Sequence, residues 1–282
     1  IPWPLYWRAT ALPALIFGVW RAHLEASNDK GGEINAHTSL SPIHIADIHM
    51  SHNDWLAIAL TLKLAGLTTL ILLVIGTPLA WWLAHTRVRI KPVLEAIIAL
   101  PLVLPPTVLG FYLLIAFAPN SAIAQFWQLL TGGTLAFSFS ALVIASVIYS
   151  LPFVVQPLQS GFQQLSKPLI EASASLGAGP IDRFFSVILP LCRSNFLVAS
   201  TLGFAHTVGE FGVVLMIGGN IPGETQVLSI ALYERVESLQ YDTAHWLAGG
   251  LIAFSLLVLS FVYLVNGYRV VTSPVQNSET AK

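Results

Sequence analysis

Apolar residues along this chain are gathered into long runs that short polar segments separate. A run of about 20 mostly apolar residues can cross the hydrocarbon core of a membrane as an α-helix. Five stretches have this character, and they cover residues 64–84, 93–118, 135–156, 194–217 and 246–266. The pattern therefore predicts an all-α, polytopic membrane protein with about five core transmembrane helices.

The composition favours a membrane protein over a water-soluble one. Charged residues make up only 10% of the chain and hydrophobic residues 55%, whereas about a quarter of the residues in a soluble domain are charged. The net charge of −1 gives no basic surface, so nucleic acid is not an expected partner. The single cysteine, Cys192, allows no disulfide framework and no thiolate metal cluster, and we expect it to be a small membrane-buried residue.

Lys and Arg predict the orientation, because positive charge in short loops stays on the cytoplasmic side. These residues follow the first, third and fifth stretches: Arg87, Arg89, Lys91, Lys167, Arg183, Arg193, Arg269 and Lys282. On the opposite side, residues 120–134 contain no Lys or Arg, and residues 220–245 contain one arginine, Arg235, among several acids. We therefore expect a multi-pass protein of the inner (plasma) membrane that contacts lipid directly. Its C-terminus, with the tail 271–282, is expected in the cytoplasm.

Lys63 stands just before the first apolar stretch, where a charge deep in lipid would be costly. We expect its amine to extend to the outer membrane interface. A role beside a transport path is the alternative.

Residues 1–53 do not fit this pattern and are treated as an N-terminal extension. Their apolar run, "ATALPALIFGVW", contains a proline and is too short to span a bilayer comfortably. Because the first methionine is Met50, we expect residues 1–49 to be an upstream extension; a short membrane-associated helix is the alternative. Three histidines in this region, His44, His49 and His52, match no compact metal site.

A polar loop at residues 164–190 interrupts the apolar runs on the expected cytoplasmic side. Ser166 is a capping-type residue, Pro168 suits a first helical turn and Gly177 suits a helix end, so a helix of about ten residues is predicted. A turn and a second, amphipathic short helix, "IDRFFSVILP", follow. Small side chains on the first helix would let a partner's groove approach closely. An ordinary loop that covers helix ends is the alternative.

The spacing inside this loop resembles the "EAA" loop of ABC-transporter permeases. That pattern is Glu-Ala-Ala, three residues, Gly, about nine residues and Ile-x-Leu-Pro. In this chain Ser173 replaces the second Ala and Val187 replaces the Ile. The resemblance implies a type I ABC importer permease fold over residues 54–270, whose coupling helix docks into a groove of a separate ATP-binding subunit. It implies coupling roles for Glu171, Ala172, Ser173, Gly177, Ala178 and Gly179.

Two further stretches are similar to the molybdate-transporter permeases. They are "LPLVLPPTVLGFYLL" (residues 100–114) and "GEFGVVLMIGGNIPGETQVLSIALY" (residues 209–233), and the resemblance covers roughly residues 54–268. It implies a permease subunit that translocates molybdate, with sulfate or tungstate as alternatives. The implied partners are an ABC ATP-binding subunit, a periplasmic or extracytoplasmic molybdate-binding protein and a second copy of the permease.

Other classes of protein find less support in the residues. A secondary transporter would usually show repeated halves and a charged midplane site, and no internal repeat is visible. The chain contains neither a Walker A pattern nor a G-x-S-x-G motif. His206 and Glu210 lie one helical turn apart, but the full H-E-x-x-H pattern of a metalloprotease is absent. We therefore expect no enzyme, catalytic residue, cofactor or metal, and ATP hydrolysis by a partner subunit.

Residues of the second and fourth stretches are candidates for a transport path or gate. Adjacent prolines free backbone groups that can line a cavity, although a simple kink explains them equally well. Hydroxyl donors suit a weak anion path, whereas a carboxylate would repel an oxyanion. We therefore expect Glu210 to bond backbone groups or hydroxyls near a helix break, in a structural or gate-shaping role. The candidates are Pro105, Pro106, Thr107, Tyr112, Glu210 and Asn220.

Overall fold

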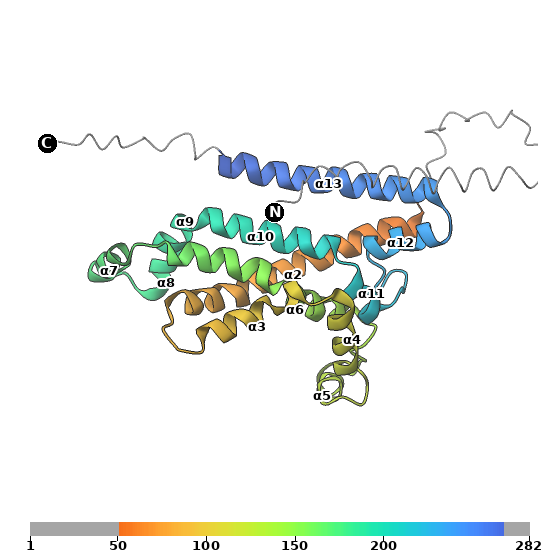
Figure 1. Cartoon of the computed structure of the whole chain (residues 1–282), viewed down its shortest axis with the longest axis horizontal. Helices are drawn as coiled ribbons and strands as arrows, with labels where there is room; N and C mark the ends of the chain where they lie inside the picture. Colours follow the sequence, from red (N-terminus) through yellow and green to blue (C-terminus); the bar gives the residue numbers. More distant parts are fainter. Residues whose placement is uncertain (1–50, 268–282) are drawn as a thin grey trace, which may run out of the picture. The chain divides into compact units, whose positions relative to one another are not determined.

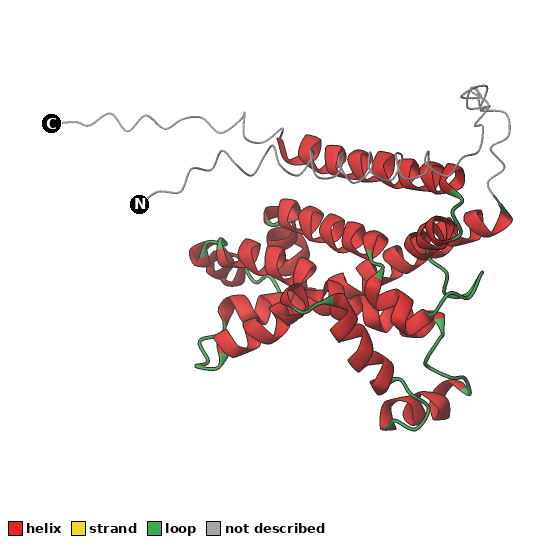
Figure 2. Ribbon diagram, turned by 45° about the vertical axis from the view of Figure 1, so that its right-hand side comes forward, coloured by secondary structure: helices red, strands yellow, loops and turns green. Residues whose placement is uncertain are grey.

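The computed structural model describes residues 51–267, and every regular element in that part of the chain is a helix (Figures 1 and 2). The predictions for the N-terminal extension, apart from its last residues, and for the tail 271–282 lie outside the described residues. The helices are α2 (His52–His85), α3 (Lys91–Val103), α4 (Pro106–Ala116), α5 (Ala122–Thr131), α6 (Phe139–Gln163), α7 (Lys167–Ser175), α8 (Pro180–Arg183), the π-helix η3 (Phe184–Ile188), α9 (Leu189–Leu191), α10 (Arg193–Gly209), α11 (Gly212–Gly218), α12 (Leu228–Glu237) and α13 (Tyr241–Gly267).

Helix α2 begins well before the first apolar stretch. A capping box starts it: the Ser51 hydroxyl accepts a hydrogen bond from the Asp54 N–H at 3.2 Å, and the Asp54 carboxylate accepts one from the Ser51 N–H at 2.8 Å. Lys63 consequently lies inside the helix, with its Nζ 4.7 Å from the ring centroid of Phe139 at the start of α6. This places Lys63 level with one end of α6, in keeping with an interfacial position.

Two of the five apolar stretches are broken rather than straight. Pro105 and Pro106 lack N–H donors, so α3 ends before them and α4 leaves at an angle of 107°. The fourth stretch divides at Glu210, whose extended backbone separates α10 from α11. In the described residues three helices are long and apolar enough to cross a membrane, or up to five if each bent pair is one span. The expected number of about five transmembrane spans is confirmed if each bent pair is counted as one span. The second bent pair joins residues 180–191 to α10, however, and not α10 to α11.

Helices α2, α6 and α10 pack closely and form the centre of the described part (Figure 1). Val154 of α6 is fully buried where the three helices meet. A β-carbon at Gly76 of α2 would lie 3.3 Å from Cγ1 of Val154, and one at Gly203 of α10 would lie 2.7 Å from Cγ2. The two glycines therefore let both neighbouring helices approach α6 more closely than larger residues would allow.

Two segments expected to be loops contain helices. Residues 120–134 hold α5, whose N-terminus is capped by the Ser121 hydroxyl. Residues 220–245 hold α12, which is tied to α2 by two contacts. The Leu228 N–H donates to Thr61 Oγ1 at 2.8 Å, and Arg235 lies 3.1 Å from the Asp54 carboxylate. These polar contacts fix α12 against the first turns of α2, a segment that the apolar pattern leaves out.

The last helix, α13, packs on α10 and α12 but is mostly exposed. Only 6% of its most apolar window is buried, although that window has a mean hydropathy of 2.3. An apolar helix with so little protein contact requires a nonaqueous environment, which agrees with a membrane span.

Candidate functional site

The first half of the polar loop forms an exposed helix. We call residues 166–191 the polar hairpin. Helix α7 begins after Ser166, which is its N-cap residue as expected, although the Ser166 side chain makes no capping hydrogen bond. Glu171 and Ala172 are exposed, and no described residue of α7 is fully buried. Gly177 has φ of +87°, a conformation that side chains disfavour, and it turns the chain after the helix.

The second half of the polar hairpin is anchored in the helical core. Phe184 packs against the cluster around α2, α6 and α10, and Ile188 is buried within it. Phe185 points away and is 61% exposed. The segment contains one π turn, in which the Leu189 N–H bonds to the Phe184 carbonyl. It then meets α10 at an angle of 79°. The hairpin therefore joins an exposed helix to the core through a few aromatic and aliphatic side chains.

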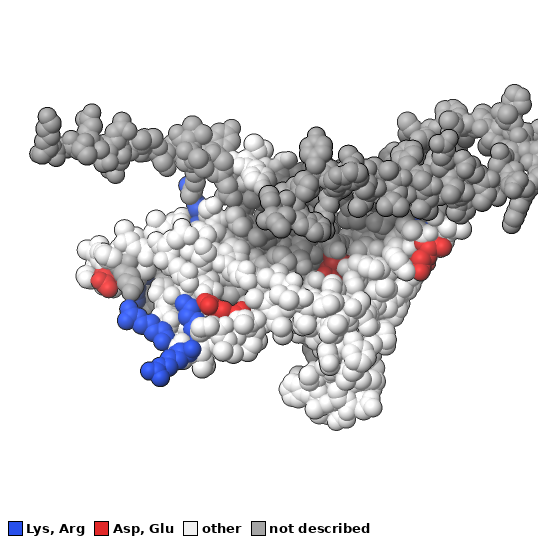
Figure 3. All heavy atoms as spheres, in the orientation of Figure 1, with Lys and Arg blue, Asp and Glu red and all other residues white. Residues whose placement is uncertain are grey.

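The two ends of the described part differ in their content of Lys and Arg. Figure 3 shows Lys and Arg gathered at the end that holds α7 and α8, with some Asp and Glu beside them, whereas the charged atoms visible at the end that holds α12 are those of Asp and Glu. The basic end includes the loop between α2 and α3, with Arg87 and Arg89. The acidic end includes Glu234 and Glu237 of α12. The end that holds α7 and α8 thus carries Lys and Arg residues that the sequence analysis assigns to the cytoplasmic side, and that assignment stays a prediction.

The breaks in the second and fourth apolar stretches lie against each other. A β-carbon at Gly212, the first residue of α11, would lie 2.9 Å from Cβ of Pro106, the first residue of α4. One turn further along α4, a β-carbon at Gly110 would lie 3.1 Å from Met216. The structure thus brings the proline pair and the Glu210 region together, although about 100 residues separate them in the chain.

Glu210 stabilises this junction through its backbone and its side chain. The residue is 7% exposed, and its carboxylate Oε1 accepts a hydrogen bond from the Val213 N–H at 2.9 Å. That N–H belongs to the first turn of α11, where helical N–H groups lack partners. The Glu210 carbonyl accepts a further bond from the Ser229 hydroxyl at 2.6 Å. The carboxylate is therefore held by backbone at a helix break, which is the kind of contact expected from the sequence.

The remaining path candidates fall in two places. Pro105 and Thr107 are exposed beside the junction, and Tyr112 is 64% exposed on α4. Asn220 lies elsewhere, after the end of α11. Its amide nitrogen donates to Glu234 at 3.1 Å, and its carbonyl oxygen accepts from Gln226 at 2.8 Å. Asn220 therefore belongs to the end of the molecule that carries α12 and not to the junction.

A second polar contact deep in the helical core escaped the sequence analysis. Ser150 of α6 lies 2.9 Å from Nδ1 of His206 and 3.2 Å from the hydroxyl of Thr207, both on α10. The His206 ring stacks on Phe153 with centroids 3.9 Å apart. No group of three or more potential metal ligands occurs among residues 51–267. His206 is thus a hydrogen-bonded core residue, and no sequence signal links it to a serine 56 positions away.

Comparisons with known proteins agree with this architecture. The molybdenum transport system permease protein ModB of Azotobacter vinelandii is 58% identical over 214 residues, which cover 76% of this chain and 95% of that protein. ModB of Escherichia coli (strain K12) is 34% identical over 185 residues, or 66% of this chain and 81% of that protein. The sulfate transport system permease protein CysT of Synechocystis is 33% identical over 192 residues, or 68% and 67%.

Solved structures show the same fold. A chain of a bacterial alginate ABC transporter, in complex with an alginate-bound periplasmic protein, matches with a TM-score of 0.65. The match covers 94% of each chain at 15% sequence identity. Residues 76–274 match the model of the binding-protein-dependent transport system inner membrane components. The chain belongs to this family of ABC importer permeases.

Proposed function

We propose that this chain is the membrane-spanning subunit through which an ABC importer moves molybdate. The observation that carries this proposal is the similarity to the molybdenum permeases, which extends over nearly the whole of the Azotobacter protein. The sulfate permease CysT, at 33% identity, is markedly less similar than the Azotobacter protein at 58%, and this difference favours molybdate over sulfate. A binding-protein-dependent system also supplies a separate ATPase and a separate binding protein, which are the proposed partners.

The polar hairpin is the proposed contact with the ATPase. Helix α7 offers exposed, small residues and makes few contacts with the rest of the chain, so its outer surface is open to a partner. The segment after it reaches the core through Phe184 and Ile188. A displacement of α7 would therefore be passed to α2, α6 and α10 through these packed side chains, which are too close to deform independently.

The junction of α4 and α11 is the proposed moving part of the path. Helices α4 and α11 each begin where a longer helical stretch is interrupted. They contact each other at their first residues, Pro106 and Gly212. Breaks of this kind let one helix segment change its angle while the long helices stay intact. Thr107 and Tyr112 supply exposed hydroxyl groups along α4, which suit weak and reversible contact with an oxyanion.

Two copies of the permease would enclose the path in this proposal, since about five spans are too few to surround one. The basic end of the described part is placed in the cytoplasm together with the C-terminus, on the strength of its Lys and Arg content. Each copy then presents one polar hairpin to one ATPase subunit.

Reconstituted transport tests the substrate. The permease, purified with its ATPase and supplied with its binding protein, is placed in proteoliposomes that contain ATP. We expect radiolabelled molybdate to accumulate, and excess unlabelled sulfate to compete poorly. Preferential uptake of sulfate, or equal uptake without ATP, would contradict the proposal.

Variants of the polar hairpin test the coupling. We expect Glu171→Lys to reverse a charge on the docking helix, and Gly177→Asp to strain the turn at φ of +87°. Both should abolish association with the ATPase and uptake, while the permease still inserts into the membrane. Asp182→Lys makes the same charge change on the next helix, at a position that the motif leaves unspecified, and should keep association. Normal amounts of co-purified ATPase with both hairpin variants would exclude this docking site.

A further inference from the structure

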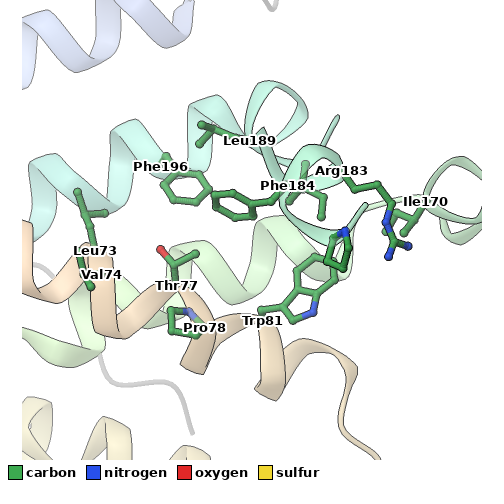
Figure 4. A pocket seen from close by; sticks show the side chains of 12 residues that line it. Leu73, Val74, Thr77, Pro78, Trp81, Ile170, Arg183, Phe184, Leu189 and Phe196 are labelled. Atoms are coloured by element: carbon green, nitrogen blue, oxygen red, sulfur yellow. The ribbon is translucent and has the colours of Figure 1, made fainter. Parts of the chain in front are cut away.

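An apolar groove runs between the polar hairpin and the long helices. Its volume is about 700 Å³. One wall comes from α2, with Val74, Thr77 and Trp81, and the other from the hairpin and α10, with Phe184 and Phe196 among others (Figure 4). The groove is open at the surface, because Val74 is 68% exposed and lines its edge. It is therefore accessible from the face of α2 that carries exposed apolar side chains.

One end of the groove carries a positive charge. Figure 4 shows Arg183 at this end, beside Ile170, with Leu73 and Phe196 toward the other end. The Nε atom of Arg183 is buried and has no hydrogen-bond partner among the described residues. A buried donor without a partner is unusual, because it loses its bond to water without compensation. No Asp or Glu lines the groove, so its charge is uncompensated there.

The mostly apolar lining of the groove, with one cation at its end, suits an amphiphilic ligand better than a free ion. Apart from Thr77 and Arg183, its lining side chains are apolar. A free oxyanion would lose its hydration shell in exchange for a single cation, which is unfavourable. A phosphate joined to acyl chains would instead place its charge at Arg183 and its hydrocarbon against Leu73, Val74 and Phe184. Arginine is well suited to phosphate, because its planar guanidinium donates two parallel hydrogen bonds.

We propose that the groove binds one anionic phospholipid of the cytoplasmic leaflet, with its phosphate at Arg183 and an acyl chain along α2. The assignment to that leaflet rests on the proposed orientation. Trp81, which lines the groove, lies near the end of α2 where aromatic residues mark a membrane interface. A lipid in this position contacts both α2 and the polar hairpin, so it fills the space between the docking helix and the core.

Binding of a phospholipid in the groove can be measured directly as lipid retention, in the absence of ATP and molybdate. The permease–ATPase complex is exchanged into nanodiscs of equal phosphatidylglycerol and phosphatidylcholine, released into detergent and analysed by native mass spectrometry. We expect one phosphatidylglycerol to be retained per permease chain in preference to phosphatidylcholine. Arg183→Gln should reduce this retention about tenfold, the loss expected for one charged hydrogen-bonding group. Arg89→Gln, which removes an exposed cation at the same end of the molecule, should leave it unchanged.

A second pair of variants tests the groove without altering the polar hairpin. Val74→Trp fills the edge of the groove and should displace the lipid, whereas Ile75→Trp, on the same helix but outside the lining, should not. Soluble glycerol phosphate should not displace the lipid, because it lacks the acyl chains. Equal retention of both lipids, equal losses in Arg183→Gln and Arg89→Gln, or displacement by glycerol phosphate would overturn the proposal. A failure of molybdate uptake would leave these results untouched, so the two proposals are tested separately.

Discussion

Gly203 is expected to be intolerant of even one added methyl group. The substitution Gly203→Ala places a β-carbon 2.7 Å from Cγ2 of Val154, whose side chain is fully buried. Carbon atoms pack favourably at about 3.5–4.0 Å, so one of the two helices has to move by about 1 Å. Val154 has little room to yield, because its side chain is fully buried and its other methyl group faces Gly76 of α2 on the opposite side.

The magnitude follows from comparison with a glycine in open space. Overpacking a buried contact costs about 1–3 kcal/mol. Replacing glycine by alanine inside a helix also gains about 1 kcal/mol through helix propensity. Gly249→Ala in α13 has no atom within 4 Å of the new β-carbon, so it keeps the gain without the clash. The difference in free energy of unfolding between the two variants should therefore be about 1–3 kcal/mol, with Gly203→Ala the less stable.

Thermal unfolding in detergent, followed by tryptophan fluorescence, measures this difference. Each kcal/mol corresponds to about 2–4 °C in Tm for a domain of roughly this size. Val154→Ala removes the methyl groups that clash, so in the Gly203→Ala background it should cost less than it does alone, with a coupling of about 1–2 kcal/mol. Equal Tm values for Gly203→Ala and Gly249→Ala, or strictly additive losses in the double variant, would refute the proposed close contact.

Two further pairs of variants test polar contacts. Glu210→Ala should lower the free energy of unfolding by about 1–3 kcal/mol, because it leaves the buried N–H of Val213 unpaired. Glu210→Gln retains an acceptor and should keep most of that stability; an equal Tm loss in both would show that the charge matters, not the bond. Arg235→Met should cost about 1–2 kcal/mol by removing the cation beside the Asp54 carboxylate, which is only 2% exposed. Adding Asp54→Asn should recover part of the loss, and no recovery in thermal unfolding would contradict an ion-pair origin.

The apolar pattern predicts the long helices of the fold, but it does not predict where the helices begin and end. The long stretches were predictable because about 20 apolar residues have few alternatives to a membrane helix. The polar start of α2 escaped this criterion, although Ser51 and Asp54 form a capping box that the spacing Ser-x-x-Asp indicates. Helices α5 and α12 are ten residues each, too short to stand out as apolar runs. Their positions depend on tertiary contacts such as the bond between Leu228 and Thr61.

The candidate site also contains features that the sequence predicts and features that depend on tertiary contacts. The polar hairpin could be located from sequence, because its motif is local and its turn at Gly177 requires a residue that adopts positive φ. The proline pair predicted freed backbone groups or a simple kink, but not a division into two helices at 107°, because α4 packs against α11 far along the chain. The contact between Ser150 and His206 likewise depends on how α6 and α10 pack.

The π turn at residues 184–188 sets the rotational phase between the two ends of the segment that joins α7 to α10. A π turn accommodates one residue more than an α turn, so the ends of the segment are out of step with an uninterrupted α-helix. Successive residues of an α-helix are rotated by about 100°. Deleting one residue from this turn would restore an α-helix and rotate α8, to which the turn after α7 is attached, by about that angle relative to α9. A permease that lacks one residue here would therefore present a face of α7 turned by about 100°, and the contact proposed for that helix would change with it.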